Sequence, residues 1–210
     1  MSKTKLSIST FSSILGIAGI EHGVGEILQG NIKPDSFFIK SWPNNKHYDI
    51  LAGEPAVTIL TGIPIFITGI IAILISALII FWAIFYAKQK HSVMIFIGLV
   101  VSLFLFGGGI AGPLLMGTLL CWAVFKMNSG FQQYKKESLL WKPLKSLWKI
   151  VFPIAIIGWF SLWPGLVLLS NSGISLDAKV VYILSTISFV TFVLTIISAL
   201  AYDNLENIKK

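Results

Sequence analysis

One apolar segment, residues 57–85, constrains the fold of this chain more than any other feature. It contains no charged residue, and only Thr, Ser, Gly and Pro interrupt its apolar side chains. A helix on the surface of a soluble protein has a polar face, whereas about 20 consecutive apolar residues are what a helix needs to cross a bilayer. The segment therefore predicts a membrane-spanning helix.

Similar apolar segments occur along the rest of the chain, at residues 8–28, 93–125, 150–169 and 180–201. Hydrophobic residues make up 55% of the sequence, charged residues 12%, and the mean hydropathy is +0.84. This composition is typical of a chain that is solvated mainly by lipid. We predict an all-α fold, a polytopic helical membrane bundle, with residues 1–210 forming a single integral membrane domain.

Two of these segments are longer than one ordinary span. Residues 55–86 would form a straight helix of about 48 Å, against a hydrocarbon core of about 30 Å, so we expect a bend at Pro64. Residues 92–126 contain glycines and a proline that disfavour a helix interior, and we expect two short arms there. These arms either cross twice or form a re-entrant hairpin, and the break is a candidate cavity lining: Gly107, Gly108, Gly109 and Pro113.

Lysine positions predict the orientation of the bundle. All sixteen basic residues are Lys, and positively charged loops stay on the cytoplasmic side. Six spans, or four and a re-entrant hairpin, with both termini cytoplasmic in the cell membrane, put only Lys33, Lys40, Lys46 and Lys179 outside. The absence of Arg removes the planar group that grips phosphate in two places, which argues against nucleic-acid binding.

Residues 140–149 have an amphipathic pattern between two apolar segments. Leu and Trp side chains fall on one side of a helix and Lys side chains on the other, as in helices that lie in the head-group layer. We therefore predict one cytoplasmic interfacial helix, with the lipid bilayer and anionic lipid head groups as its partners. Its lipid-interface residues would be Trp141, Lys142, Lys145, Trp148 and Lys149.

The first apolar segment contains the most unusual chemistry in the chain, namely Glu21, His22 and Glu26. Residues four apart are neighbours on a helix, so His22 and Glu26 share a face. Ionisable groups inside a membrane are costly, so they pair, face a wet cavity or carry function. Three interpretations stay open: contacts that hold helices together, a proton or cation site, and a metal site. Weak metal candidates are His22, Glu26 and His47, in the long outer loop.

The later segments contain no Asp, Glu or His, so a relay through the membrane would depend on hydroxyl groups. Candidates are Thr58, Thr61, Thr68 and Ser76. The sequence also lacks the usual motifs for a serine nucleophile, a zinc protease or a phosphate-binding loop. No cofactor is predicted, although a divalent metal is compatible with the patch.

These observations favour a small, non-enzymatic, multi-pass membrane protein. It would bind or conduct a small solute or ion through Glu21, His22 and Glu26, facing a cavity open to the outside. The first alternative is an accessory or lipid-interacting subunit without transport activity, acting as a homo-oligomer or with a membrane-complex partner. The second alternative is a metal-dependent intramembrane enzyme.

Overall fold

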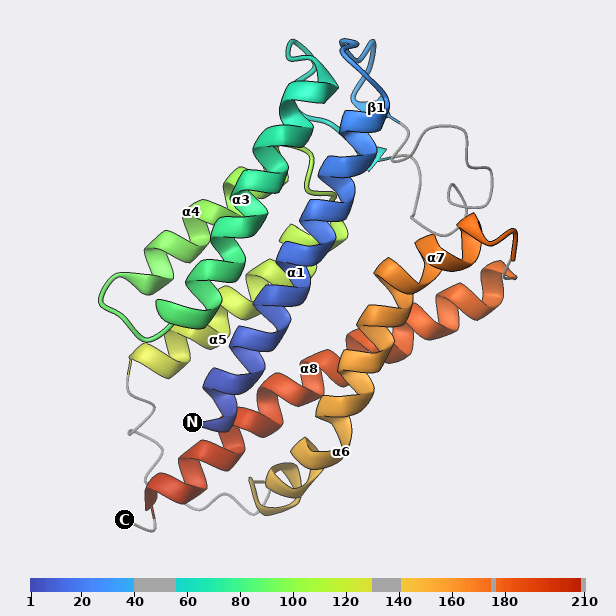
Figure 1. Cartoon of the computed structure of the whole chain (residues 1–210). Helices are drawn as coiled ribbons and strands as arrows, with labels where there is room; N and C mark the ends of the chain where they lie inside the picture. The colour runs from blue at the N-terminus through green and yellow to red at the C-terminus, as the bar shows by residue number, and fades with distance from the viewer. Residues whose placement is uncertain (40–55, 130–140, 175–176, 209–210) are drawn as a thin grey trace.

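The computed structural model describes residues 1–39, 56–129, 141–174 and 177–208, and within them it is helical apart from one short strand pair (Figure 1). The strands β1 (Phe38–Ile39) and β2 (Ala56–Val57) pair antiparallel. The helices, in chain order, are α1 (Lys3–Leu28), α3 (Ile65–Phe85), α4 (Ser92–Leu105), the π-helical turn η1 (Ala111–Gly117), α5 (Thr118–Asn128), α6 (Trp141–Phe160), the π-helical turn η2 (Ser161–Gly165), α7 (Leu166–Asn171) and α8 (Ala178–Ile208).

Three helical segments in the described part of the chain are long and apolar enough to cross a membrane. They are Ile65–Phe85, Trp141–Trp163 and Ala178–Glu206. The all-helical fold predicted from the sequence is thereby confirmed, and the membrane-length helices agree with a membrane protein. The six-span arrangement stays a prediction, since α1 carries Glu21, His22 and Glu26 within its apolar part and α4 has only 14 residues.

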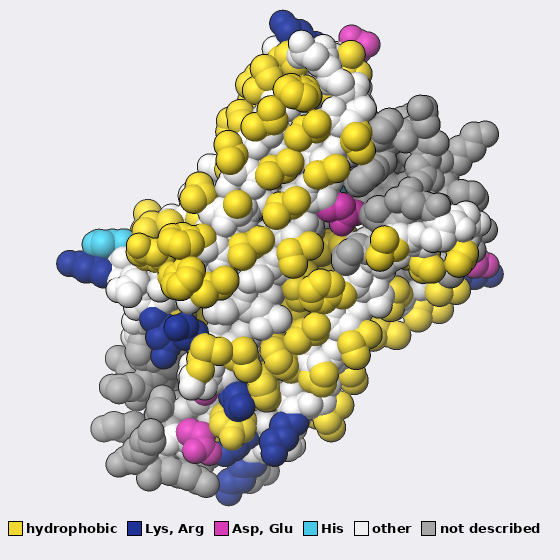
Figure 2. Space-filling model, in the orientation of Figure 1, with side chains coloured by type: hydrophobic (Ala, Val, Ile, Leu, Met, Phe, Trp, Pro, Cys, Tyr) yellow, Lys and Arg dark blue, Asp and Glu magenta, His cyan; other side chains and the backbone are white. Residues whose placement is uncertain are grey.

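Many apolar side chains are exposed on the face of the molecule shown in Figure 2. Leu74 and Leu78 on α3, Met94 on α4, and Tyr182 and Ile183 on α8 are each more than half exposed. Leaving a Leu, Ile or Phe side chain in water instead of burying it costs about 1.5–3 kcal/mol. An apolar surface on this scale is therefore suited to contact with lipid.

Two helix pairs, α1 with α3 and α6 with α8, form the body of the molecule, and α1 lies between α3 and the second pair (Figure 1). Helix α1 packs along α3, while α6 packs along α8 and the first half of α1 reaches α8. Where the pairs meet, the Phe11 ring lies 4.8 Å from the Phe192 ring. The amino and carboxyl termini lie at the same end of the bundle (Figure 1).

The described lysines of the predicted cytoplasmic set gather at this end. The Ser9 hydroxyl donates a hydrogen bond to Ala83 O, which puts the α3–α4 loop beside the start of α1. Asn128, at the end of α5, donates to Ala87 O in the same loop, and Lys145 of α6 forms an ion pair with Glu206 of α8. The described lysines in these segments are Lys3, Lys5, Lys88, Lys90, Lys126, Lys142, Lys145 and Lys149.

Helices α1 and α3 approach closely because glycine lies on both sides of their contact. A Cβ atom added to Gly23 would be 2.6 Å from Gly69 O, which is shorter than any normal contact. Small residues at such a crossing let two helix backbones pack together in a membrane.

We predict that Gly23→Ala destabilises the protein by about 1–3 kcal/mol, because the added methyl group overpacks this crossing. The measurement is the free energy of unfolding in mixed detergent micelles. Gly98→Ala is the matched control, since Gly98 lies inside α4 with nothing within 4 Å of its added Cβ. That change should be neutral or stabilise α4, because Ala is the better helix former. Equal effects of the two changes would contradict the close crossing.

The predicted bend at Pro64 is wrong, because Pro64 precedes the helix. It is the N-cap residue of α3, with φ −57° and ψ 137°, and α3 begins at Ile65. Residues on both sides of Pro64 bond to the segment that follows α1: Thr58 N–H donates to Phe37 O, and Ile65 N–H, at the start of α3, donates to Ile32 O. Helix α3 therefore has 21 residues and is about 32 Å long, close to the hydrocarbon thickness.

A separate interfacial helix is not found over the described part of residues 140–149, since Trp141 begins α6 and this helix continues through Pro153 to Phe160. Trp148 is buried, and not at a lipid interface as predicted. Its ring stacks on Phe152, and its Nε1–H donates to Ser7 Oγ at 3.0 Å. The Trp148 part of the face that the sequence assigns to lipid packs on α1, whereas Leu147 of the same face is exposed. Lys142 and Lys149 are exposed, as an interfacial role requires.

The predicted break in residues 92–126 is confirmed. Helix α4 ends at Leu105, and the chain turns through Gly107 and Gly109, both of which have positive φ. The two arms return beside each other, since Asn128 Nδ2 donates to Ser92 Oγ at 2.6 Å. The segment is therefore a helical hairpin with its glycine turn at one end.

Candidate functional site

Glu26 is the most deeply buried ionisable group of the predicted patch. It lies near the end of α1 with 3% of its surface exposed. Its Oε2 lies 2.7 Å from the hydroxyl oxygen of Thr68 on α3. Among the residues that the structure describes, no cationic side chain forms an ion pair with Glu26. A buried carboxyl group therefore has a single neutral hydrogen-bonding partner in this part of the chain.

The glycine turn after α4 packs directly on this carboxyl group. A Cβ atom added to Gly107 would be 2.5 Å from Glu26 Cδ and closer still to its Oε1. Gly107 has φ +90°, a conformation that glycine adopts without the penalty other residues incur. Two properties of glycine are therefore needed at position 107. It adopts the positive φ of the turn, and its lack of a Cβ atom leaves room for the Glu26 carboxyl group.

His22, one turn of helix α1 before Glu26, contacts the same glycine turn. A Cβ atom added to Gly109, which has φ +75°, would be 2.8 Å from His22 Nε2. The ionisable patch and the glycine break are far apart in the sequence, yet the structure brings them together as one site. We call Glu26, His22, Thr68, Gly107 and Gly109 the Glu26 site.

Other predicted residues lie outside the Glu26 site. Glu21 is partly exposed and projects about 100° away from His22 around α1. Gly108 packs on Leu103 of its own hairpin arm, and Pro113 is buried within η1. These two positions shape the turn without contacting the patch in the way that Gly107 does.

A metal centre has little support in the described residues. His47 lies outside the residues that the structure describes, so its prediction stays open. Within the described ranges, no group of three or more His, Cys, Asp or Glu side chains could hold a metal ion. Metal binding by His22 and Glu26 accordingly stays a prediction.

A second polar contact, not predicted from the sequence, joins the two ends of the chain. The backbone N–H groups of Lys3 and Thr4 donate to the two carboxylate oxygens of Asp203, at 2.9 and 2.8 Å. Helix α1 has no acidic residue in its own first turn. Asp203 of α8 therefore supplies the negative group that a helix N-terminus attracts. Lys3 Nζ also lies 4.5 Å from the Trp148 ring centre.

No protein-family model, curated protein or solved structure matches this chain. The class of protein therefore follows from the fold and the surface: the described residues are helical apart from one short strand pair, and three helices among them are long and apolar enough to cross a membrane. Any function has to be argued from the site.

Proposed function

We propose that this chain is a small multi-pass membrane protein that binds or conducts a small cation, the proton included, at the Glu26 site. The observation that carries the proposal is the burial of Glu26 without a cationic partner in the described residues. An ionised carboxylate away from water is costly unless a positive charge compensates it. Either a proton or a bound cation would remove this cost.

The hydrogen bonds of Thr68 support the same proposal. Its hydroxyl oxygen lies 2.7 Å from Glu26 Oε2 and 2.9 Å from Ile65 O, yet a hydroxyl has one hydrogen to donate. If that hydrogen goes to Ile65 O, the contact with Glu26 requires a proton on the carboxyl group. If it goes to Glu26, the carboxyl group can be charged. The geometry is compatible with both states, as a group that gains and loses a cation requires.

The glycine turn adds a second argument. Non-helical backbone at membrane depth is tolerated only beside protein or water, and broken helices provide the ion sites of many transporters. The carboxyl-terminal end of α4, which carries the negative end of the helix dipole, leads into the turn two residues before Gly107. Both the carboxyl group and the helix end would favour a cation.

The proposal includes the orientation of the bundle. The termini and the lysine-rich loops share one end, which we assign to the cytoplasm by the positive-inside rule. The Glu26 site then lies toward the outer side. Under this assignment α1 crosses the cell membrane, and the α4–α5 hairpin either crosses twice or re-enters, giving six spans or four.

The test is cation flux into liposomes that contain the full chain. A potassium diffusion potential would drive proton uptake, followed with an internal pH dye, and a second series would follow sodium uptake. We expect flux above that of protein-free liposomes, reduced at least tenfold by Glu26→Gln. Asp35→Asn is the matched control, because it removes one negative charge from an exposed loop residue. Flux of neither ion, or equal flux in both variants, would contradict conduction of these ions through the Glu26 site.

The accessory subunit is the second candidate, and the packing of α1 on α3 favours it. Buried hydrogen bonds and small residues also hold helices together in membranes, and Glu26–Thr68 and Gly23–Gly69 have both properties. In that case the wild-type chain would carry no cation, and Glu26→Gln would change its oligomeric state or the recovery of a membrane partner.

A further inference from the structure

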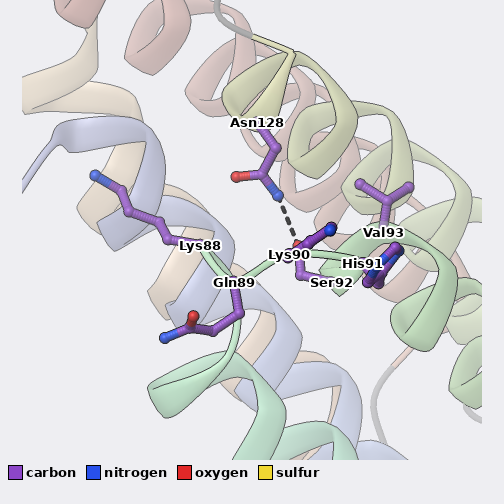
Figure 3. Close-up of a pocket in the computed structure, with 7 residues that line it drawn as sticks. All are labelled: Lys88, Gln89, Lys90, His91, Ser92, Val93 and Asn128. Carbon is purple, nitrogen blue, oxygen red and sulfur yellow. Dashed lines mark hydrogen bonds between the residues drawn. The ribbon is translucent and has the colours of Figure 1, made fainter.

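A pocket outside the Glu26 site opens at the lysine-rich end of the bundle. It is lined by residues 88–91 of the loop that joins α3 to α4, by Ser92 and Val93 at the start of α4, and by Asn128 at the end of α5 (Figure 3). Its volume is about 280 Å³, slightly below the ~300 Å³ at which small-molecule pockets usually begin. A pocket of this size suits a compact group better than a large ligand.

Hydrogen bonds hold the wall of this pocket in place. Asn128 Nδ2 donates to Ala87 O and to Ser92 Oγ, and the Ser92 hydroxyl donates to Ala87 O. Ser92 is 1% exposed and Ala87 is buried, so their hydrogen bond is shielded from water, whereas Asn128 is exposed at the rim. The loop therefore has a fixed shape even though the cationic side chains around it are exposed.

The charge around the pocket is positive. Lys88, Lys90 and His91 are exposed lining residues, and Figure 3 shows the Lys88 side chain reaching away from Lys90 and His91. Helix α4 begins at Ser92, and its N-cap residue His91 makes no capping hydrogen bond through its side chain. A helix start without such a cap leaves N–H groups that favour an anion. No acidic residue is among the lining residues that the structure describes.

Large apolar side chains flank the pocket on both helices. Phe85 of α3 is 59% exposed, and Met94 of α4 is 70% exposed. A ligand with an anionic group and an apolar tail would contact both features at once. A free inorganic anion would contact the positive charges but not the apolar side chains.

We infer that this pocket binds the phosphate head group of an anionic phospholipid, with the acyl chains along the exposed faces of α3 and α4. Lysine near a membrane surface attracts anionic lipid, and basic pockets between helices on the cytoplasmic side accept such head groups. The site differs from the interfacial segment predicted from the sequence, because none of its lining residues lies in α6. It does not require cation binding at Glu26, but it rests on the orientation given with the proposed function, which assigns the lysine-rich end to the cytoplasm.

The test measures lipid binding to the purified full chain in a neutral detergent. The probe is short-chain phosphatidylglycerol, with phosphatidylcholine and inorganic phosphate as separate arms, and affinity is read by native mass spectrometry. We expect Lys88→Gln with Lys90→Gln to weaken phosphatidylglycerol binding at least tenfold. The matched control, Lys33→Gln with Lys179→Gln, removes the same charge from exposed lysines outside the pocket and should leave affinity unchanged.

A third variant, Gln89→Glu, places a negative charge in the same loop and should weaken binding without removing a lysine. Thermal unfolding without lipid shows whether each variant is folded. Equal losses in the two double variants would mean that total charge alone determines affinity, and would overturn the inference. Equal binding of phosphatidylcholine, or binding of inorganic phosphate as tight as that of phosphatidylglycerol, would overturn it as well.

Discussion

Gly107→Ala is expected to destabilise the protein by about 3 kcal/mol. The new methyl group would overlap the Glu26 carboxyl group, and overpacking of this kind costs about 1–3 kcal/mol. The backbone at φ +90° adds about 1–2 kcal/mol for any residue with a Cβ atom. The measurement is the free energy of unfolding in mixed micelles.

Gly30 provides a closely matched control for this prediction. It has φ +89°, but a Cβ atom added there would meet nothing within 4 Å. Gly30→Ala should therefore cost only the backbone term, about 1–2 kcal/mol. The difference between the two variants isolates the contact with Glu26. If Gly30→Ala and Gly107→Ala cost the same, the glycine turn does not pack on Glu26.

A double variant tests the same contact from the other side. In a Glu26→Ala background the carboxyl group is gone, so Gly107→Ala should lose most of its steric cost. Residues in contact give non-additive effects of about 0.5–3 kcal/mol in such cycles. Additive effects would count against the Glu26 site as a single structural unit.

Asp203→Ala is expected to cost about 2 kcal/mol. It removes two hydrogen bonds to a charged carboxylate, and a hydrogen bond to a charged group contributes about 1.5–3 kcal/mol. The loss is smaller than the sum of two such bonds, because water can bond to the freed N–H groups at this part-buried helix end. The measurements are the free energy of unfolding and the hydrogen-exchange rates of the Lys3 and Thr4 amides. Both amides should exchange faster in the variant.

Asp177→Ala is the control for this second prediction. Asp177 also accepts a backbone N–H, from Lys179 at 2.8 Å, but it is exposed and the bond lies within its own segment. An exposed hydrogen bond from a backbone N–H to a nearby Asp side chain contributes about 1 kcal/mol or less to stability. If Asp203→Ala leaves the exchange of the α1 amides unchanged, Asp203 does not hold the start of that helix.

Local patterns in the sequence predicted the break at Gly107 and the shared face of His22 and Glu26, because both follow from backbone preference and helical spacing. The contact between these two features depends on how the α4–α5 hairpin packs on α1, which no local pattern encodes. Thr68 was one of four candidate hydroxyl residues, and only the crossing at Gly23 and Gly69 selects it.

The incorrect predictions have the same origin. Pro64 can bend a helix or precede one, and pairing of residues 58–65 with residues 32–37 decides between them. The apolar side of α6 at Trp148 could face either lipid or protein, and the sequence pattern is the same in both cases. Burial against α1 follows from the bond between Trp148 and Ser7, which are 141 positions apart.

The bond between the start of α1 and Asp203 also bears on how the chain is made. Its two partners are 200 positions apart, so the ribosome adds the acceptor long after the donors. At about 5–20 residues per second, the first turn of α1 waits about 10–40 s for Asp203. Until then α1 can pack on α3, but its first turn lacks this anionic partner. Synthesis of Asp203 in α8 therefore completes the hydrogen bonding at the start of α1.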